Sequence, residues 1–571
     1  MNYFYIYTFT LLATLTFLGY GSLLASIVGK KILKSNIGYI GLTGLLACTI
    51  ISYITIFFTK HGYLHNVILH LVGLSLFIYF FLNKKIEFRV PTFLIIFSIL
   101  YIGLLILRNH DDFNYYHLTY SLGLTENKLI FGLGNLGHGY THHSSIFFLN
   151  SILYLPIIKY FLFHSIGWIT LLFINLILIE KILIKKNNIL NFEFFFYLLS
   201  FLFINFKFFR VGSFGTDLSG QIIMLSTIPL VYKLYDFKKI EQLNKSLLSL
   251  VVILITYATT LKAFMILNFL YLLPLLFFTK IKNIRAIILP RVYVFSFLTI
   301  LLLSSLNFSY TGCVIYPVKQ TCFDKNVQWS LSKEHVGMMN QWYQQWSKAG
   351  AGIDYRINDP KEYIKKFNWV SNWYERYFLY KFKETLLGIT FLLLIVFISF
   401  YPKNKKNIKK NTYKFEIKSK FFKKPTIIIA SVTGLLFAEW FYQHPALRYG
   451  GYYLLTALIF IPFASILAER KIKFSQKYKV IYFLIFLSYF LYNGKNFNRI
   501  KNELNMFSEN NFPLFNSPKQ KFTENDIGND IKIYVPTNLS GCWAIKTPCI
   551  HTSGHVIGSK FGSYKMILKK K

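Results

Sequence analysis

The chain of 571 residues is 54% hydrophobic and 19% aromatic but only 15% charged. Soluble globular proteins carry about a quarter charged residues, and disordered chains are poor in hydrophobic ones, so both classes are excluded and a membrane protein remains. The formal net charge of +39 could indicate a nucleic-acid partner. However, Lys outnumbers Arg and accompanies abundant Asn, Ile, Phe and Tyr, a bias typical of A/T-rich coding sequences, and we expect no nucleic-acid partner.

Apolar segments of membrane-spanning length recur along the chain. A helix of about 17 to 25 apolar residues crosses a bilayer and satisfies its own backbone hydrogen bonds. The pattern predicts an all-α polytopic membrane protein of about 14 (12 to 14) transmembrane helices. The predicted segments are 3–27, 37–58, 63–82, 91–107, 163–184, 190–209, 219–235, 246–262, 264–279, 291–308, 384–401, 426–442, 451–468 and 479–493.

The basic residues indicate the orientation. Short cytoplasmic loops collect Lys and Arg. Alternate connections are rich in these residues, namely those near Lys30, Lys84, Lys185, Lys238, Lys282, Lys405 and Lys471. This alternation predicts that both termini lie outside, in the periplasm of a bacterial inner membrane. The first segment lacks a basic start, which favours a retained helix over a cleaved signal peptide.

Three long segments then fall on the outer side: about 108–162, 309–383 and 494–571. We expect the first two to be periplasmic loops of a transmembrane domain, 1–493, and 494–571 to be a separate C-terminal periplasmic segment. Two cysteine pairs lie there, Cys313 with Cys322 and Cys542 with Cys549. Closely spaced pairs in an oxidising compartment predict two disulfides, and their spacing does not match zinc clips.

Acidic residues are scarce, and three of them stand beside predicted helices on the outer side. Asp111 and Asp112 lie in RNHDDFNYYHLTYSLGL, and Asp217 lies in RVGSFGTDLSGQ. Each could cap a helix. A cap needs one carboxylate, whereas the pair is followed closely by further polar groups. The alternative is a carboxylate that deprotonates an acceptor hydroxyl or binds a divalent metal at the membrane surface.

Histidine and tyrosine side chains surround this acidic pair in the sequence. Tyr116 lies one helical turn after Asp112, and His117 follows it; His138, His142 and His143 come in the same outer segment. The irregular spacing of these histidines favours a His-rich binding surface over a zinc site. No cofactor is certain from the sequence, and a divalent metal stays open.

Arg is rare in this chain, yet Arg108, Arg210 and Arg448 lie at outer helix ends, and Lys262 lies at another. They could anchor helices at the interface by snorkelling. Their chemistry also suits phosphate, since Arg offers a bidentate fork and Lys a point charge. Glu439 could pair with such a base or act as a second acid.

Five of the eight Trp fall in the segment 309–383. Trp is favoured on helices that lie on the membrane surface, and its flat ring also suits stacking on sugars. Both interpretations can hold together, and the first is favoured.

The order of motifs resembles a family of large bacterial inner-membrane proteins similar to the type C glycosyltransferases, which use polyprenyl-phosphate sugar donors. The motifs are DDFNYYHL, GLGNLGHG, HHSS, GTDLSG, TTLKAF, YPVKQTCF, FYQHPALRYGG and GCWAIKTPC. The resemblance covers most of the chain and is strongest over 110–145 and 541–549. Type C enzymes place their acidic loop after the first helix, whereas three helices precede the one that leads to it here.

The resemblance implies that Asp112, with its neighbour Asp111, acts as base or metal ligand, and that Asp217 is a second acid. It implies that Lys262 and Arg448 bind the donor phosphate; Arg210, Tyr116, His117 and His143 are further candidates for substrate binding. The expected partners are a polyprenyl-phosphate-linked sugar, membrane lipid and a glycan or lipid acceptor.

Three other functions stay open. A flippase for lipid-linked oligosaccharides would also have many helices, although transporters hold ionisable groups near the bilayer centre and here those groups gather at one face. An O-antigen polymerase or ligase would share the substrates and the location, and a non-enzymatic scaffold would use the outer loops for partners.

Overall fold

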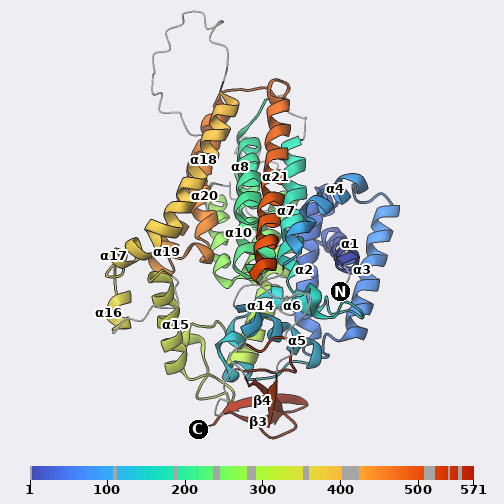
Figure 1. Ribbon diagram of the computed structural model, residues 1–571, viewed down its shortest axis with the longest axis vertical. Helices are drawn as coiled ribbons and strands as arrows, with labels where there is room; N and C mark the ends of the chain where they lie inside the picture. Colours follow the sequence, from blue (N-terminus) through green and yellow to red (C-terminus); the bar gives the residue numbers. More distant parts are fainter. Residues whose placement is uncertain are drawn as a thin grey trace, which may run out of the picture.

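The computed structural model describes most of the chain. It covers residues 3–106, 112–183, 189–214, 216–235, 245–278, 291–350, 359–401, 424–506, 521–537, 541–550 and 556–570. Asp111 and Arg108 therefore lie outside the described residues. The rest folds mainly as helices that run side by side (Figure 1).

Each of the fourteen predicted apolar segments coincides with helical structure. The corresponding elements are α1 (Tyr3–Val28), α2 (Ile37–Thr55), α3 (Tyr63–Leu82), α4 (Val90–Leu100), α7 (Ser165–Leu183), α8 (Phe192–Lys207), α10 (Thr216–Leu234), α11 (Lys245–Leu261), η8 (Ala263–Tyr271) with α12 (Leu273–Phe278), α14 (Arg291–Thr311), α18 (Lys383–Phe400), α19 (Lys424–Gln443), α20 (Gly451–Glu469) and α21 (Phe474–Met506). The last of these extends well beyond the predicted end at residue 493, because its final turns are polar and give no apolar signal.

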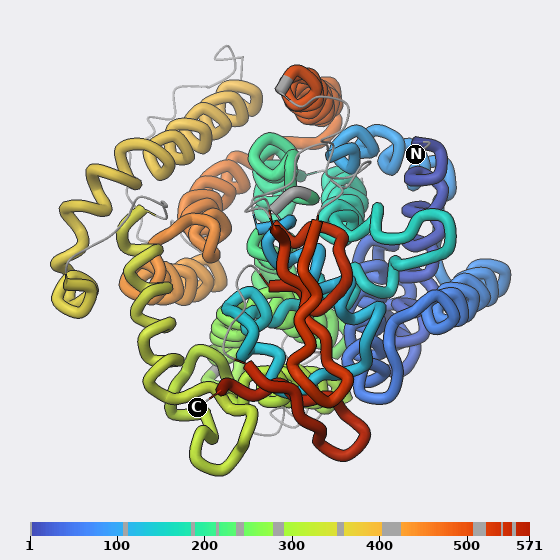
Figure 2. The backbone as a smooth tube through the Cα atoms, turned by 60° about the horizontal axis from the view of Figure 1, so that its bottom comes forward, coloured from blue at the N-terminus to red at the C-terminus, as the bar shows by residue number. Residues whose placement is uncertain are grey.

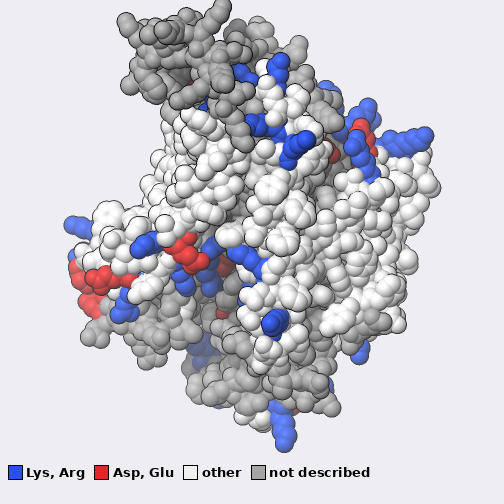
Figure 3. All heavy atoms as spheres, turned by 45° about the horizontal axis from the view of Figure 1, so that its top comes forward, with Lys and Arg blue, Asp and Glu red and all other residues white. Residues whose placement is uncertain are grey.

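Eight of the helices are long and apolar enough to cross a membrane, counted over the described residues. They are α1, α2, α3, α7, α14, α19, α20 and the continuous helix Val370–Phe400 that contains α18. The molecular surface has a belt nearly free of Lys, Arg, Asp and Glu between charged side chains above and below it (Figure 3). Length, hydropathy and this belt together define a polytopic α-helical membrane protein.

Glycines let the first three helices pack closely. A Cβ atom on Gly21 of α1 would lie 1.9 Å from the carbonyl oxygen of Ile40 in α2, and one on Gly19 would lie 1.9 Å from that of Gly73 in α3. Small residues are the usual means by which membrane helices approach each other, since lipid supplies no hydrophobic force between them.

One end of the bundle, at the bottom of Figure 1, carries most of the short elements, and we call it the loop-rich end. The elements between α4 and α7 are η2 (Tyr101–Leu104), η3 (Phe113–His117), α5 (Leu118–Glu126), η4 (Leu133–Leu136), η5 (His138–Thr141), α6 (Ser145–Ser151) and η6 (Tyr160–Leu162). Those between α14 and α18 are η9 (Lys319–Thr321), α15 (Lys333–Lys348), α16 (Pro360–Ile364), α17 (Val370–Trp373) and η10 (Tyr374–Phe382).

The C-terminal segment adds four strands at this end, paired as two antiparallel hairpins. They are β1 (Phe522–Asp526) with β2 (Lys532–Pro536) and β3 (Val556–Phe561) with β4 (Tyr564–Lys569). The two predicted disulfides are confirmed, Cys313–Cys322 and Cys542–Cys549.

The strands lie across the segment that follows Asp112 (Figure 2). Phe131 exchanges backbone hydrogen bonds with β4, receiving one from Ile567 and donating one to Lys565. The Tyr140 hydroxyl donates to the carbonyl of Cys549 (2.8 Å). The backbone N–H of Trp543 donates to the carbonyl of Asn114 (3.1 Å). The C-terminal segment is thus a cover for this part of the loop-rich end rather than a detached unit.

Candidate functional site

Three charged side chains from different breaks between helices meet at the loop-rich end. Asp217 lies in the first turn of α10, Lys262 follows the last residue of α11, and Arg448 lies in η11 (Leu447–Tyr449) between α19 and α20. Lys262 Nζ is 2.7 Å from one carboxylate oxygen of Asp217, and Arg448 Nε is 3.1 Å from the other. We call these residues, together with Asp112, the Asp217 cluster.

The exposure of the partners is unequal. The side chain of Asp217 is 9% exposed, whereas those of Lys262 and Arg448 are 32% and 35% exposed. Burial alone would raise the pKa of Asp217, but the two cations and the hydrogen bond from Lys262 outweigh it and hold that pKa at about 2. Asp217 therefore stays an anion, and it positions two cations whose side chains remain about a third exposed.

Arg448 is held by its backbone as well as by its side chain. The amide of Gln221, one turn into α10, donates to the carbonyl of Arg448 (2.8 Å). Gly450 has φ +111°, in the left-handed region that favours glycine, and a Cβ there would lie 2.3 Å from the ring of Phe264. This turn after Arg448 starts α20 and fixes where the guanidinium points.

The ring of Tyr449 stands beside both cations. Lys262 Nζ lies 5.1 Å and the Arg448 guanidinium carbon 5.0 Å from its centroid, which is within range of cation–π attraction. Tyr449 and Gln221 were not predicted from the sequence as site residues. Their only signal is proximity in the chain to Arg448 and Asp217.

Asp112 approaches the cluster from another segment. One of its carboxylate oxygens is 3.8 Å from the guanidinium of Arg448, and its side chain is 31% exposed. Asp112 already has helical backbone angles (φ −67°, ψ −16°), whereas a helix-capping residue has extended ones. Capping therefore does not explain Asp112. The turn that follows, Phe113–His117, is a π-helix, a widened turn that often accompanies functional sites.

Aromatic and imidazole rings form a wall beside the cluster. The ring of Tyr116 contacts those of His117, His138 and His142. Burial raises the pKa of the Tyr116 phenol, which therefore stays neutral. Burial, with Lys262 nearby, lowers the pKa of His142 to about 3, so this ring is neutral at pH 7.

Helix α15, in the segment between α14 and α18, contributes further rings to this wall. The hydroxyl of Tyr343 and Nε2 of His142 are 3.3 Å apart, and the exposed ring of Trp342 lies 6.1 Å from that of His138. Trp369 and Trp373, by contrast, are buried, and Trp373 donates its indole N–H to the carbonyl of Pro445 (2.8 Å). The prediction that Trp rings lie on the membrane surface or stack on a sugar is wrong for these two residues, because packing against α19 encloses their rings.

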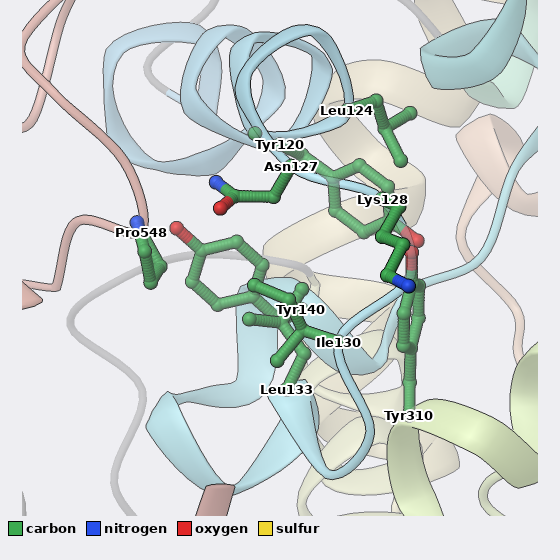
Figure 4. A pocket seen from close by; sticks show the side chains of 10 residues that line it. Tyr120, Leu124, Asn127, Lys128, Ile130, Leu133, Tyr140, Tyr310 and Pro548 are labelled. Atoms are coloured by element: carbon green, nitrogen blue, oxygen red, sulfur yellow. The ribbon is translucent and has the colours of Figure 1, made fainter. Parts of the chain in front are cut away.

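His143 points to a different place. Its Nδ1 is 2.9 Å from the hydroxyl of Tyr120, and its ring stacks on Tyr310. Burial lowers the pKa of His143 to about 3. Tyr120 and Tyr310 also line a small pocket with Tyr140 and Pro548, under the C-terminal cover (Figure 4). Lys128 is the charged residue among those lining it.

Arg210 belongs to a second group of charges, which we call the Glu503 cluster. Its guanidinium is 3.3 Å from Glu503, which also pairs with Arg499 at 2.9 Å. Arg499 donates to the carbonyl of Leu105 as well (2.9 Å). The prediction placed Arg210 with Lys262 and Arg448, but Arg210 instead ties the end of α8 to the polar end of α21. Glu439 is exposed on α19.

Within the described ranges, no three His, Cys, Asp or Glu side chains come together as a set of metal ligands. Asp112 and Asp217 each face Arg448, so their charge is directed toward cations of the protein.

The long apolar helices and the charged cluster at their ends define a polytopic membrane protein with a candidate anion site. The family model "Domain of unknown function (DUF8201)" matches residues 1–455, and the chain belongs to this family. The matched range contains the whole Asp217 cluster and ends before Arg499, Glu503 and the C-terminal strands. No curated protein and no solved structure matches the chain.

Proposed function

We propose that this protein is a membrane glycosyltransferase similar to the type C enzymes, which moves a sugar from a polyprenyl-phosphate donor to a periplasmic or lipid-linked acceptor. One observation carries the proposal: Lys262 and Arg448 are locked by a buried carboxylate while a third of each side chain stays exposed. Two fixed cations at the edge of an apolar bundle suit the phosphate of a lipid-linked donor.

The donor phosphate is the leaving group in this reaction. The bond between the anomeric carbon and the phosphate oxygen breaks, and the phosphate departs with the electron pair. Lys262 and Arg448 stabilise the charge that grows on it. Because Asp217 already fixes both cations, they need little rearrangement as that charge develops, which is the property that makes such groups effective.

Asp112 is the base in the proposed reaction. Its carboxylate takes the proton from an acceptor hydroxyl, whose oxygen attacks the anomeric carbon. Asp112 is more exposed than Asp217 and lies 3.8 Å from Arg448, so the acceptor and the phosphate would lie side by side. Asp217, with its pKa of about 2, is a positioning residue here.

The sugar would lie against the neighbouring wall of rings. Tyr116, neutral His142 and Tyr343 offer hydroxyl and imidazole groups, and the exposed ring of Trp342 offers a flat apolar face. A divalent metal would bind near Asp112 if it takes part; its contribution would be to neutralise the donor phosphate.

The proposal includes a finer topology. The six apolar helical segments beyond the eight long ones, namely α4, α8, α10, α11, η8 with α12, and α21, cross the membrane too, which gives fourteen spans. The loop-rich end and both termini face the periplasm of a bacterial inner membrane, because the described connections α3–α4 and α20–α21, which carry Lys84, Lys85, Lys471 and Lys473, lie at the opposite end (Figure 1).

The test compares surface polysaccharide and lipid-linked sugar in cells that carry wild-type protein, Asp112→Asn or Lys262→Ala. Both variants should lose most of the glycan and accumulate the lipid-linked donor. Lys365→Ala is the matched control, since Lys365 is 62% exposed and pairs only with the neighbouring Glu362 among its described contacts. Unaltered glycan in both variants would contradict the proposal.

A flippase would give a different pattern. Loss of flipping would leave lipid-linked sugar on the cytoplasmic side, out of reach of a glycosidase added outside the inner membrane. Donor that accumulates on the periplasmic side supports transfer; donor that accumulates on the cytoplasmic side supports transport.

A further inference from the structure

Three lysines meet at the loop-rich end, outside both charged clusters. Lys207 is the last residue of α8, Lys381 lies in η10, and Lys495 lies in α21. Lys495 Nζ donates to the carbonyl of Phe206 (3.2 Å), which places it directly beside Lys207. Lys207 is within electrostatic range of both Lys381 and Lys495, and the acid nearest to the group is the exposed Glu384. We call these three residues the Lys207 patch.

The convergence of three ammonium groups is unfavourable by itself. Like charges repel, and one exposed carboxylate compensates only part of their charge. Snorkelling would explain one lysine at a helix end, but it would let the three spread apart along the interface. Here Lys495 is held over the ring of Phe206 (3.3 Å to the centroid) and Lys207 over that of Tyr452 (5.0 Å). These contacts hold the ammonium groups of Lys495 and Lys207 against aromatic rings.

The surroundings of the patch are those of a membrane surface. Large apolar side chains of η10, α18 and α21 next to it are exposed, among them Tyr380, Leu387 and Phe497. An anion bound here would therefore have apolar surface alongside it, as the phosphate of a lipid has its acyl or prenyl chains.

The patch is also connected to the Asp217 cluster. The hydroxyl of Tyr452, in the first turn of α20, lies within electrostatic range of Glu384 on one side and of Arg448 on the other. Leu447, the neighbour of Arg448, donates its N–H to the hydroxyl of Tyr377 (2.7 Å), and Lys381 lies over the ring of Tyr377 (5.9 Å).

The geometry points to a second binding site, for the phosphate group of a membrane lipid, formed by Lys207, Lys381 and Lys495 between α8, α18 and α21. The lipid chains lie along the exposed apolar residues of α18 and α21. This inference does not depend on sugar transfer, because any lipid phosphate at this surface would bind by the same contacts.

The test measures lipid binding to the purified full-length protein by native mass spectrometry in detergent. The probes are a short-chain polyprenyl monophosphate, phosphatidylglycerol and, as a soluble anion, inorganic phosphate. The double variant Lys207→Ala/Lys495→Ala should weaken binding of the lipid phosphate about tenfold, because it removes two of three charge-assisted contacts. The relative affinity of the two lipids identifies the source of the phosphate.

The controls separate charge from folding and from the proposed catalytic site. Lys207→Arg/Lys495→Arg should keep the binding. Lys471→Ala/Lys473→Ala, at the opposite end of the bundle, should leave it unchanged. Equal binding in the Lys207→Ala/Lys495→Ala variant, an equal loss in the Lys471→Ala/Lys473→Ala variant, or displacement of lipid by inorganic phosphate at the same concentration would overturn the inference.

Discussion

Two buried carboxylates at the loop-rich end are each held by two cations. The two clusters differ in how much of the cationic side chains remains exposed. Glu503 pairs with Arg210, whose side chain is 27% exposed, and with Arg499, which is 5% exposed and also donates to the carbonyl of Leu105. Asp217 pairs with Lys262 and Arg448, which are both about a third exposed.

This difference distinguishes a structural cluster from the proposed binding site. The guanidinium of Arg499 is enclosed in the protein. Its hydrogen bond to the carbonyl of Leu105 joins α21 to the segment after α4. The cations of the Asp217 cluster keep donors that face outward next to an exposed carboxylate, Asp112. Both central acids are buried, with Glu503 5% and Asp217 9% exposed, so burial of the acid does not distinguish the two clusters; the enclosure of Arg499 does.

The largest effect on stability is expected at Glu503. Glu503→Ala leaves Arg499 as an unpaired charge inside the protein, which costs about 3–5 kcal/mol. Thermal unfolding in detergent should show a clear loss, whereas the double variant Arg499→Ala/Glu503→Ala should lose less than the sum of the single changes. Strict additivity would show that the two side chains do not interact.

Asp217→Ala should have a smaller effect on stability, about 2–3 kcal/mol, because water can reach the two cations it leaves behind. It should abolish glycan formation even in the folded fraction, since Lys262 and Arg448 lose their fixed position. Asp530→Asn, an exposed partner of Lys560, is the matched control. Normal glycan from Asp217→Ala would mean that the cations need no anchor.

Loss of the second disulfide should cost about 2 kcal/mol, as expected for a short loop. Cys542→Ser/Cys549→Ser loosens the loop whose residues Trp543 and Cys549 bond to Asn114 and Tyr140. Limited proteolysis should then cut the C-terminal segment more rapidly. Cleavage at the wild-type rate would show that the strands stay in place without the bridge.

The pH dependence should come from histidines rather than from Asp217. The folded-state pKa values of His142 and His143 are about 3, below the usual 6.5, so the unfolded chain binds more protons between these values. Stability is therefore full above about pH 6.5 and falls, by about 1 kcal/mol per His and pH unit, as pH decreases. Asp217 loses its contribution only below about pH 4, toward 2.

The measurement compares melting temperatures at pH 7.5 and pH 5.0. The variant His142→Asn/His143→Asn should show a smaller decrease than wild type. An equal decrease in both proteins would assign the acid sensitivity to other groups.

The sequence predicts the helices well because membrane-spanning segments must be long and apolar. The disulfides follow in the same way from the side on which the cysteine pairs lie. The contact between Asp217, Lys262 and Arg448 can also be predicted from the sequence, since rare charges at the same ends of neighbouring helices have few other partners.

Other parts of the site leave no local pattern. Arg210 resembles Arg448 in the sequence, and what separates them is Glu503, which lies far along the chain in polar turns of α21. The cover over residues 113–140 depends on pairing between Phe131 and β4, which is a contact between distant segments. Tyr449 and Gln221 are ordinary residues that acquire a role only through the fold.

The central claim is that the exposed faces of Lys262 and Arg448 bind donor phosphate while Asp112 activates the acceptor. The most direct measurement is transfer of a radiolabelled sugar from a polyprenyl phosphate donor by purified protein in lipid nanodiscs. We expect Lys262→Ala and Asp112→Asn to reduce turnover at least a hundredfold, with Asp112→Asn still binding the donor and Lys365→Ala unaffected. Transfer at the wild-type rate by Asp112→Asn and Lys262→Ala would contradict the account.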